Sequence, residues 1–192
     1  HRPFLVAADA MTRAGIAVVR YDDRGVGESD GAVSLDGATS EDFARDSAAA
    51  LTTLRNRPEV DASATGLLGH SEGGIIAASL AAEDPGIAFV VLLAAPGGPG
   101  AELLMMQSRA ILEASGVPEA TIDALGEANR RIYEAIEEHP EDEAAAEAVT
   151  SIMRELGMSK EQIEAQLGSL LSAWYRYFLS YDPAQDLERL TM

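Results

Sequence analysis

The sequence predicts an α/β fold, in which helices flank both faces of a parallel sheet, and three observations support this. Helix-like and strand-like segments alternate from the start of the chain to about residue 100. Residues 88–95 form a continuous apolar run, as expected for a strand buried on both faces. Residues 69–74, G-H-S-E-G-G, join a short apolar run to a helical pattern, which indicates a sharp strand-to-helix turn.

Length and composition indicate one acidic globular domain of 192 residues, of which 47% are hydrophobic. The absence of cysteine excludes disulfides, thiolate catalysis and cysteine-based zinc sites. The three histidines lie far apart in the sequence, so we expect no metal and no cofactor. The net charge of −18 argues against nucleic acid and anionic membrane surfaces as partners. No apolar run approaches the ~20 residues that span a bilayer, and no motif indicates the oligomeric state.

The elements of the first hundred residues follow from hydrophobic periodicity and from helix caps. The first helix presents Phe4, Ala8 and Met11 on one face, and Thr39 with Asp42 forms an acidic version of a capping box at the second. In chain order we predict a helix at 2–14, a strand at 16–21, a helix at 39–57, a strand at 65–69, a helix at 72–83 and a strand at 88–95.

Beyond residue 100 the alternation stops, and residues 101–181 are helical in pattern with breaks near 116–118, 139–140 and 157. Ser159 and Gln162 form a capping box, and one long apolar face is predicted from there to Phe178. Because such sheets average about five to six strands, we expect elements to be missing at both ends. The N-terminus looks cut, so the absence of a signal segment does not decide the location. A cytoplasmic location is slightly favoured, and secretion stays open.

Ser71 is the candidate nucleophile, because G-x-S-x-G between a strand and a helix describes a nucleophile elbow. The turn exposes the serine in strained backbone at the carboxyl end of the strand, and the positions two before and two after it must lack bulk. The N–H of Glu72 then lies at a helix N-terminus, where a developing negative charge is stabilised. The alternative is a glycine-rich turn that binds a phosphate or nothing. The elbow residues around the serine are Gly69, His70, Gly73 and Gly74.

The polar neighbours of this serine each have more than one interpretation. His70 points to the opposite face of the strand, so we expect a structural role for it. The Glu72 side chain is a general acid, a carboxylate favoured by the helix dipole, or a group that faces the substrate pocket. Asp23 and Arg24 bind a substrate carboxylate or tie down their loop. The glycines that follow Arg24 do not fit a phosphate-binding pattern.

Adaptable methionines and flat aromatic side chains suit an apolar acyl pocket under a lid. Met105, Met106 and Trp174 are the candidates for that pocket, with Tyr175 and Tyr177 beside them. The alternative for each is an ordinary core position.

The composite of motifs resembles the α/β-hydrolase superfamily, and more narrowly bacterial esterases related to serine aminopeptidases and prolyl-oligopeptidase-type enzymes. The pieces that carry the resemblance are P-F-L-V-A-A-D-A-M-T-R-A-G-I-A-V-V-R-Y-D-D-R-G-V-G-E-S, L-L-G-H-S-E-G-G and W-Y-R-Y-F-L-S-Y-D-P. The resemblance implies a partial α/β-hydrolase fold, with a core at 1–100 and 171–192 and a helical lid at 101–170. It also implies that Ser71 is the nucleophile and that the backbone N–H of Glu72 is one half of the oxyanion hole.

The triad order in this superfamily is serine, then an acid, then a histidine. The sole histidine downstream of Ser71 is His139, which lies in an acidic break and is expected to be solvated. Asp182 and Asp186 are expected to be helix-end residues. We therefore expect the acid and the base of the triad beyond Met192, outside this chain.

Three functions are consistent with these motifs. The first is a serine hydrolase that cleaves small-molecule carboxylic esters through an acyl-enzyme, as a carboxylesterase does. The second is an aminopeptidase-like serine peptidase with the same machinery. The third, of a different class, is a non-catalytic scaffold with this fold, which an intact elbow argues against.

Overall fold

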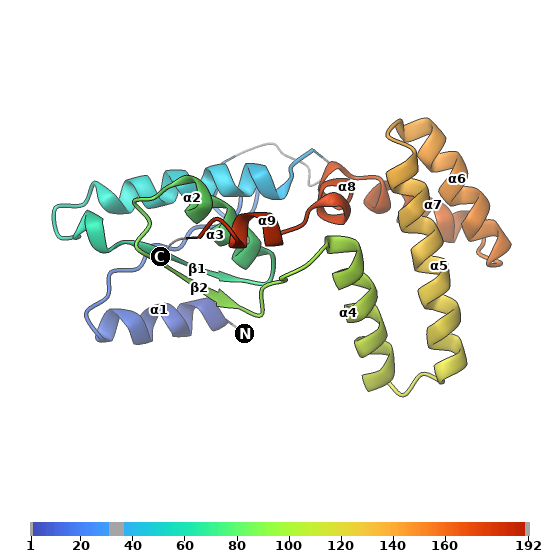
Figure 1. Cartoon of the computed structure of the whole chain (residues 1–192), viewed down its shortest axis with the longest axis horizontal. Helices are drawn as coiled ribbons and strands as arrows, with labels where there is room; N and C mark the ends of the chain where they lie inside the picture. Colours follow the sequence, from blue (N-terminus) through green and yellow to red (C-terminus); the bar gives the residue numbers. More distant parts are fainter. Residues whose placement is uncertain (1, 31–36, 191–192) are drawn as a thin grey trace.

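The computed structural model describes residues 2–30 and 37–190, and its first half alternates helices with strands (Figure 1). The elements of this half agree with the predicted helices and with two of the predicted strands. In chain order they are α1 (Pro3–Arg13), α2 (Ser40–Arg55), the short 3₁₀ helix η1 (Ala62–Ala64), β1 (Gly66–His70), α3 (Glu72–Glu83) and β2 (Phe89–Leu93).

The second half of the chain is helical, as predicted, with breaks where glycine or proline interrupts the pattern. The predicted long face after residue 159 is interrupted by an unpredicted break at residues 171–172, where the Ser172 hydroxyl accepts a hydrogen bond from the Tyr175 N–H (3.2 Å) and caps a new helix. The helices are α4 (Gly100–Ala114), α5 (Glu119–Glu138), α6 (Asp142–Glu155), α7 (Lys160–Leu170), α8 (Ala173–Ser180) and α9 (Ala184–Leu187).

The sheet of the described residues consists of β1 and β2, which pair in parallel from Gly66 opposite Phe89 to His70 opposite Leu93. Helix α3 connects them and packs on one face of the sheet, and α2 packs on α3. The connection buries a small core around Leu51, which lies on α2, and Ala81, which lies on α3. The carboxyl ends of both strands therefore lie together at the amino end of α3 (Figure 1).

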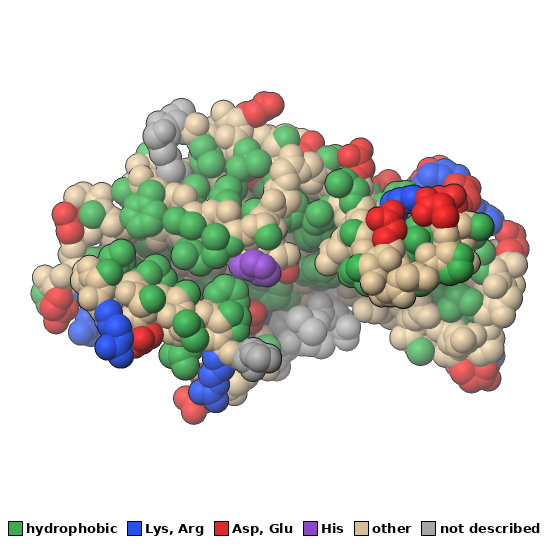
Figure 2. All heavy atoms as spheres, turned by 90° about the horizontal axis from the view of Figure 1, so that it is seen from below, with side chains coloured by type: hydrophobic (Ala, Val, Ile, Leu, Met, Phe, Trp, Pro, Cys, Tyr) green, Lys and Arg blue, Asp and Glu red, His purple; other side chains and the backbone are tan. Residues whose placement is uncertain are grey.

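One predicted strand is absent, at residues 16–21, and the predicted burial of residues 88–95 on both faces is wrong, for one physical reason. Residues 16–21 pair with neither strand, and Ile16 and Val19 stay about half exposed. In β2, alternate residues such as Phe89 (46%) and Leu93 (43%) are exposed, and the residues between them are partly buried, so only one face of the strand is covered. A β-branched or apolar run becomes a buried strand only where neighbours pair with it and cover it. The view from the α1 side shows the resulting apolar surface (Figure 2).

The helices after β2 enclose a hydrophobic core of their own, distinct from the core around Leu51. Helices α5, α6 and α7 stand at one end of the molecule, away from the sheet (Figure 1). Their fully buried side chains include Ile136 from α5 and Met153 from α6, and Leu179 of α8 joins the same core. Helix α8 thus connects this core to the part of the chain that carries the sheet.

A close approach joins the beginning of α4 to the end of α8. The Gly100 N–H donates to the Tyr181 carbonyl oxygen (3.1 Å). A β-carbon at Gly100 would overlap the carbonyl oxygen of Phe178, so glycine is required there.

The predicted capping box at α2 is confirmed, because the Thr39 N–H donates to the Asp42 carboxylate (3.0 Å). This bond, assisted by Arg45 and Arg24, holds the pKa of Asp42 below its ordinary value. A depressed folded-state pKa stabilises the fold above the unfolded value of about 4, and the contribution is lost as the pH falls through the folded pKa.

We therefore expect Asp42→Asn to have a flatter stability profile in acid than the unmodified protein. Its free energy of unfolding should fall less between about pH 5 and about pH 3, because the substituted side chain has no charge to lose. Urea unfolding at both pH values measures this, with Glu147→Gln on the exposed face of α6 as the control. Parallel profiles for Asp42→Asn and the unmodified protein would contradict the prediction.

Candidate active site

Ser71 lies in the turn between β1 and α3 with φ of 55° and ψ of −121°, in the region that disfavours side chains. The strained backbone predicted for the elbow is therefore present. The Ser71 N–H donates to the Leu93 carbonyl oxygen (3.0 Å), which fixes the turn to the end of β2. The side chain is exposed at the carboxyl edge of the sheet.

Close packing at the elbow requires two glycines, but not the pair that the motif predicts. A β-carbon at Gly69 would overlap the carbonyl group of Gly73, so this position has no room for a side chain. A β-carbon at Gly74 would overlap that of Ala95, because α3 lies against the chain after β2. A β-carbon at Gly73 meets nothing within 4 Å, so the requirement for a small residue lies one position later than predicted.

The amino end of α3 presents free backbone donors beside the serine. The Gly74 N–H donates to the Ser71 carbonyl oxygen (2.9 Å), whereas the Glu72 N–H has no acceptor within residues 2–30 and 37–190. Such unpaired groups at a helix N-terminus carry partial positive charge and attract anions. The site can therefore stabilise negative charge next to the serine hydroxyl.

A second strained residue, which the sequence does not reveal, lies at the end of the neighbouring strand. Ala94 has φ of 48° directly after β2. Non-glycine residues in this conformation cost about 1–3 kcal/mol and cluster at functional sites. No residue-type signal marks Ala94 in the sequence, because alanine is not a residue that favours this geometry.

The carboxylate of Glu72 accepts two hydrogen bonds from distant parts of the chain. Ser40 Oγ at the start of α2 lies 2.7 Å from Glu72 Oε1, and Trp174 Nε1 on α8 lies 2.7 Å from the same oxygen. This side chain therefore joins three helices at the elbow. The sequence marks Glu72 and Trp174 separately, but no pattern in it indicates Ser40.

A family model described as serine aminopeptidase, S33, matches residues 4–170. The chain belongs to the serine aminopeptidase S33 family. The match includes α1 through α7, and with them the elbow. It confirms the resemblance to the α/β-hydrolase superfamily and indicates a serine hydrolase in the general sense. Neither a curated protein nor a solved structure matches the chain.

In the described part of this S33 family member, no hydrogen bond joins His70 or His139 to Ser71. His70 is exposed, and its ring meets that of Phe4 from α1 edge-on at 6.1 Å. His139 follows α5, and its Nδ1 lies 2.9 Å from the Ala135 carbonyl oxygen of the same helix. The contact of His70 fits the structural role expected for it, whereas His139, which was expected to be solvated, is partly buried against its own helix.

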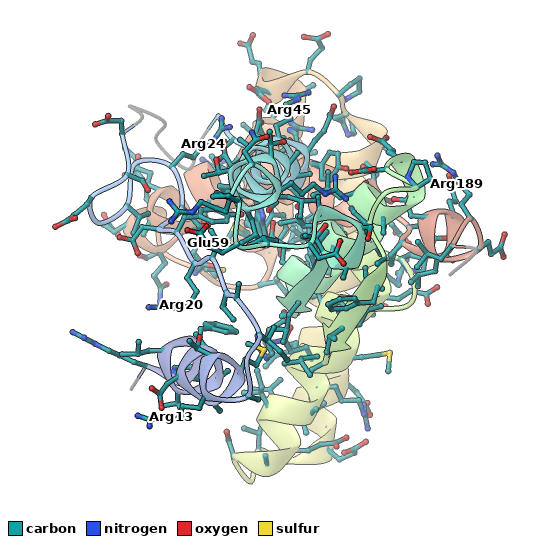
Figure 3. All side chains as sticks on the ribbon, turned by 90° about the vertical axis from the view of Figure 1, so that its left-hand side faces the viewer. Arg13, Arg20, Arg24, Arg45, Glu59 and Arg189 are labelled. Carbon is teal, nitrogen blue, oxygen red and sulfur yellow. The ribbon has the colours of Figure 1, made fainter. Side chains whose placement is uncertain are left out.

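Arg24 connects its loop to α2 (Figure 3). Its guanidinium donates to both oxygens of Asp46, at 2.6 Å and 2.7 Å, and to the Asp42 carbonyl oxygen. The Asp46 carboxylate raises the pKa of Arg24 above its ordinary value. This pairing fits the interpretation of Arg24 as a loop anchor, since its donors are engaged by the protein itself.

The three candidate pocket residues lie in different surroundings. Met105 packs against the core of α5 to α7, Met106 is 69% exposed, and Trp174 is partly buried beside Glu72. A hollow of about 320 Å³ lies between α4 and α5 and includes none of the three. Its lining residues are Leu104, Gln107, Ser108, Ile111, Leu112, Asn129 and Tyr133.

Asp182 and Asp186 accept hydrogen bonds at the junction of α8 and α9, as expected for residues at helix ends. The Asp182 carboxylate accepts a hydrogen bond from the Ala184 N–H (3.0 Å), and the Asp186 carboxylate accepts one from the Tyr181 hydroxyl.

Across the described ranges, no three metal-ligating side chains gather into a cluster. The helices described here include none with the length and apolar character needed to cross a bilayer.

Proposed function

We propose that this chain carries the nucleophile of a serine hydrolase that cleaves carboxylic esters, with Ser71 as the nucleophile and the Glu72 N–H as an oxyanion donor. One observation carries the proposal: an exposed serine in strained backbone lies beside an unpaired N–H at a helix N-terminus. Membership of the S33 family supports hydrolase chemistry of this general type.

In the proposed reaction, Ser71 Oγ attacks the ester carbonyl carbon while a base takes the hydroxyl proton. The negative charge that forms on the carbonyl oxygen is stabilised by the Glu72 N–H. When the C–O bond to the alcohol breaks, the proton passes to the leaving oxygen and an acyl-serine remains. Water then cleaves that ester by the same steps and releases the acid.

The base and the acid of the triad are proposed to lie outside this chain. The support is that His139 Nδ1 lies 2.9 Å from the Ala135 carbonyl oxygen of its own helix, and that no hydrogen bond within residues 2–30 and 37–190 joins it to the elbow. We expect His139→Ala to retain ester turnover within about twofold, because the side chain takes no proton in this scheme. Steady-state kinetics on a p-nitrophenyl ester test this in the full-length protein. A loss approaching that of a nucleophile variant would identify His139 as the base.

The decisive experiment treats the full-length protein with a fluorophosphonate probe and locates the label by peptide mass spectrometry. Labelling at Ser71 supports its assignment as the nucleophile, and the absence of any label at Ser71 favours a non-catalytic scaffold.

A serine peptidase is the second candidate, because the matching family is described as a serine aminopeptidase. Turnover of p-nitrophenyl esters against aminoacyl p-nitroanilides distinguishes the two substrates.

We further propose that residues 101–170 form a lid over the substrate site, and that residues 1–100 and 171–192 belong to the hydrolase core. The support is that α5, α6 and α7 have their own hydrophobic core and follow the strand next to the elbow. Insertions at this edge of an α/β sheet shape the ligand pocket.

Deleting residues 101–170 is therefore expected to change acyl-chain preference by at least about tenfold and to leave a folded protein. The rate ratio between p-nitrophenyl acetate and p-nitrophenyl octanoate measures preference, and circular dichroism measures folding. An unfolded deletion variant would show that these helices are part of the core instead.

A further inference from the structure

We propose that Ser40 and Trp174 are positioning residues that hold the Glu72 carboxylate away from the amino end of α3, so that the Glu72 N–H stays free for the oxyanion. This inference rests on the proposed function, in which that N–H receives the negative charge. The juxtaposition that carries it is the pair of 2.7 Å hydrogen bonds from Ser40 Oγ and Trp174 Nε1 to a single carboxylate oxygen.

A carboxylate in the first turn of a helix is attracted to the unpaired N–H groups there. Glu72 is the first residue of α3, so its own side chain is the nearest anion that can occupy those donors. In the structure, the two hydrogen bonds that this side chain accepts come from other helices. The backbone donors beside Ser71 are thereby left without an internal competitor.

The same contacts matter electrostatically. A negative carboxylate close to a developing oxyanion opposes it, and the repulsion grows steeply as the separation decreases in a partly buried site. Two donors on one oxygen stabilise the negative charge of the carboxylate and fix the side chain. The N-terminus of α3 can therefore still stabilise the oxyanion, although the Glu72 carboxylate lies on the same residue.

Both donors are themselves held in place by their surroundings. Ser40 is 4% exposed and follows Thr39 in the capping box of α2. The Trp174 indole stacks on Phe178 with ring centroids 5.0 Å apart and meets Tyr175 edge-on at 6.0 Å. Groups fixed by packing in this way provide hydrogen bonds without reorganising during the reaction.

The test uses Trp174→Phe and Ser40→Ala, each of which removes one donor and little else. Phenylalanine keeps an aromatic ring that can stack on Phe178, and alanine keeps the helix. We expect kcat to fall about tenfold in each variant while KM stays within about twofold, since the lost interaction acts on the transition state. Thr52→Ala on α2, whose hydroxyl donates to the Ala48 carbonyl oxygen of the same helix (2.9 Å), is the matched control.

Rescue separates positioning from a merely structural role. Glu72→Gln retains an oxygen that accepts from Ser40 and Trp174, but it carries no charge to oppose the oxyanion. The double variant Trp174→Phe with Glu72→Gln is therefore expected to recover most of the kcat lost in Trp174→Phe. If the Trp174 contact only stabilised the fold, neutralising Glu72 would restore nothing.

The hydrogen bond itself has a direct spectroscopic signature, because Trp174 is the single tryptophan of the chain. Its one indole N–H resonance should move upfield in the NMR spectrum of Glu72→Ala, because the hydrogen-bond acceptor is lost.

Ser71 labelling by the fluorophosphonate separates failure of the proposed function from failure of the positioning role. Absence of labelling would overturn the proposed function, whereas labelling with unchanged kcat in Trp174→Phe and Ser40→Ala would overturn the positioning role alone.

Discussion

Replacing Ser71 with alanine is expected to abolish fluorophosphonate labelling and to lower ester turnover on the order of 10⁴-fold or more. The nucleophilic oxygen is lost, while the backbone, the free Glu72 N–H and the glycine contacts of the elbow stay as they are. Alanine has the same β-carbon as serine, so the strain at φ of 55° is unchanged. The thermal midpoint should therefore stay close to that of the unmodified protein.

Ser71→Gly sharpens this experiment, since glycine adopts positive φ at no steric cost. It should be as inactive as Ser71→Ala and yet unfold at a higher temperature, because about 1 kcal/mol of strain is relieved. Ser63→Ala, in the exposed η1, is the control for serine removal. Retention of most ester turnover by Ser71→Ala would show that another residue is the nucleophile.

Gly69→Ala is expected to destabilise the fold by at least about 3 kcal/mol, with a drop in thermal midpoint on the order of 10 °C. The new β-carbon would overlap the Gly73 carbonyl group, and backbone cannot move aside as a flexible side chain can. Either β1 or the first turn of α3 must shift, which also displaces Ser71. Thermal unfolding and ester turnover should both report the change.

Gly73→Ala is the matched control, because the same methyl group is added four residues away in open space. Alanine is favoured over glycine in a helix, so this variant should be as stable as the unmodified protein or up to about 1 kcal/mol more stable. Equal destabilisation by the two substitutions would mean that the elbow packs differently in solution.

Local features of the chain were predictable because local rules govern them. The elbow at Ser71 follows from the spacing of glycines between an apolar run and a helix, and the caps at Thr39 and Ser159 follow from residues three apart. Such features need only the neighbouring residues, so the sequence is sufficient to place them.

Features that depend on distant segments were not predictable. The residues that meet at Glu72 are separated from it by 32 and 102 positions, and no pattern in the sequence couples them. Residues 16–21 have the composition of a strand, but composition does not supply the partner that a hydrogen-bonded ladder requires. The half-exposed β2 shows the same limit, because an apolar run does not specify which of its faces a helix will cover.

The hydrogen bond between Gly100 and Tyr181 has a consequence for how this protein can be engineered. The segment between these two residues begins and ends at one backbone contact, with the Gly100 nitrogen 3.1 Å from the Tyr181 carbonyl oxygen. A segment whose ends already meet can be exchanged for a helical segment of another length at little cost in loop closure. The junction is therefore a natural graft point, provided that a glycine at position 100 and a hydrogen-bond donor to Glu72 are carried across with it.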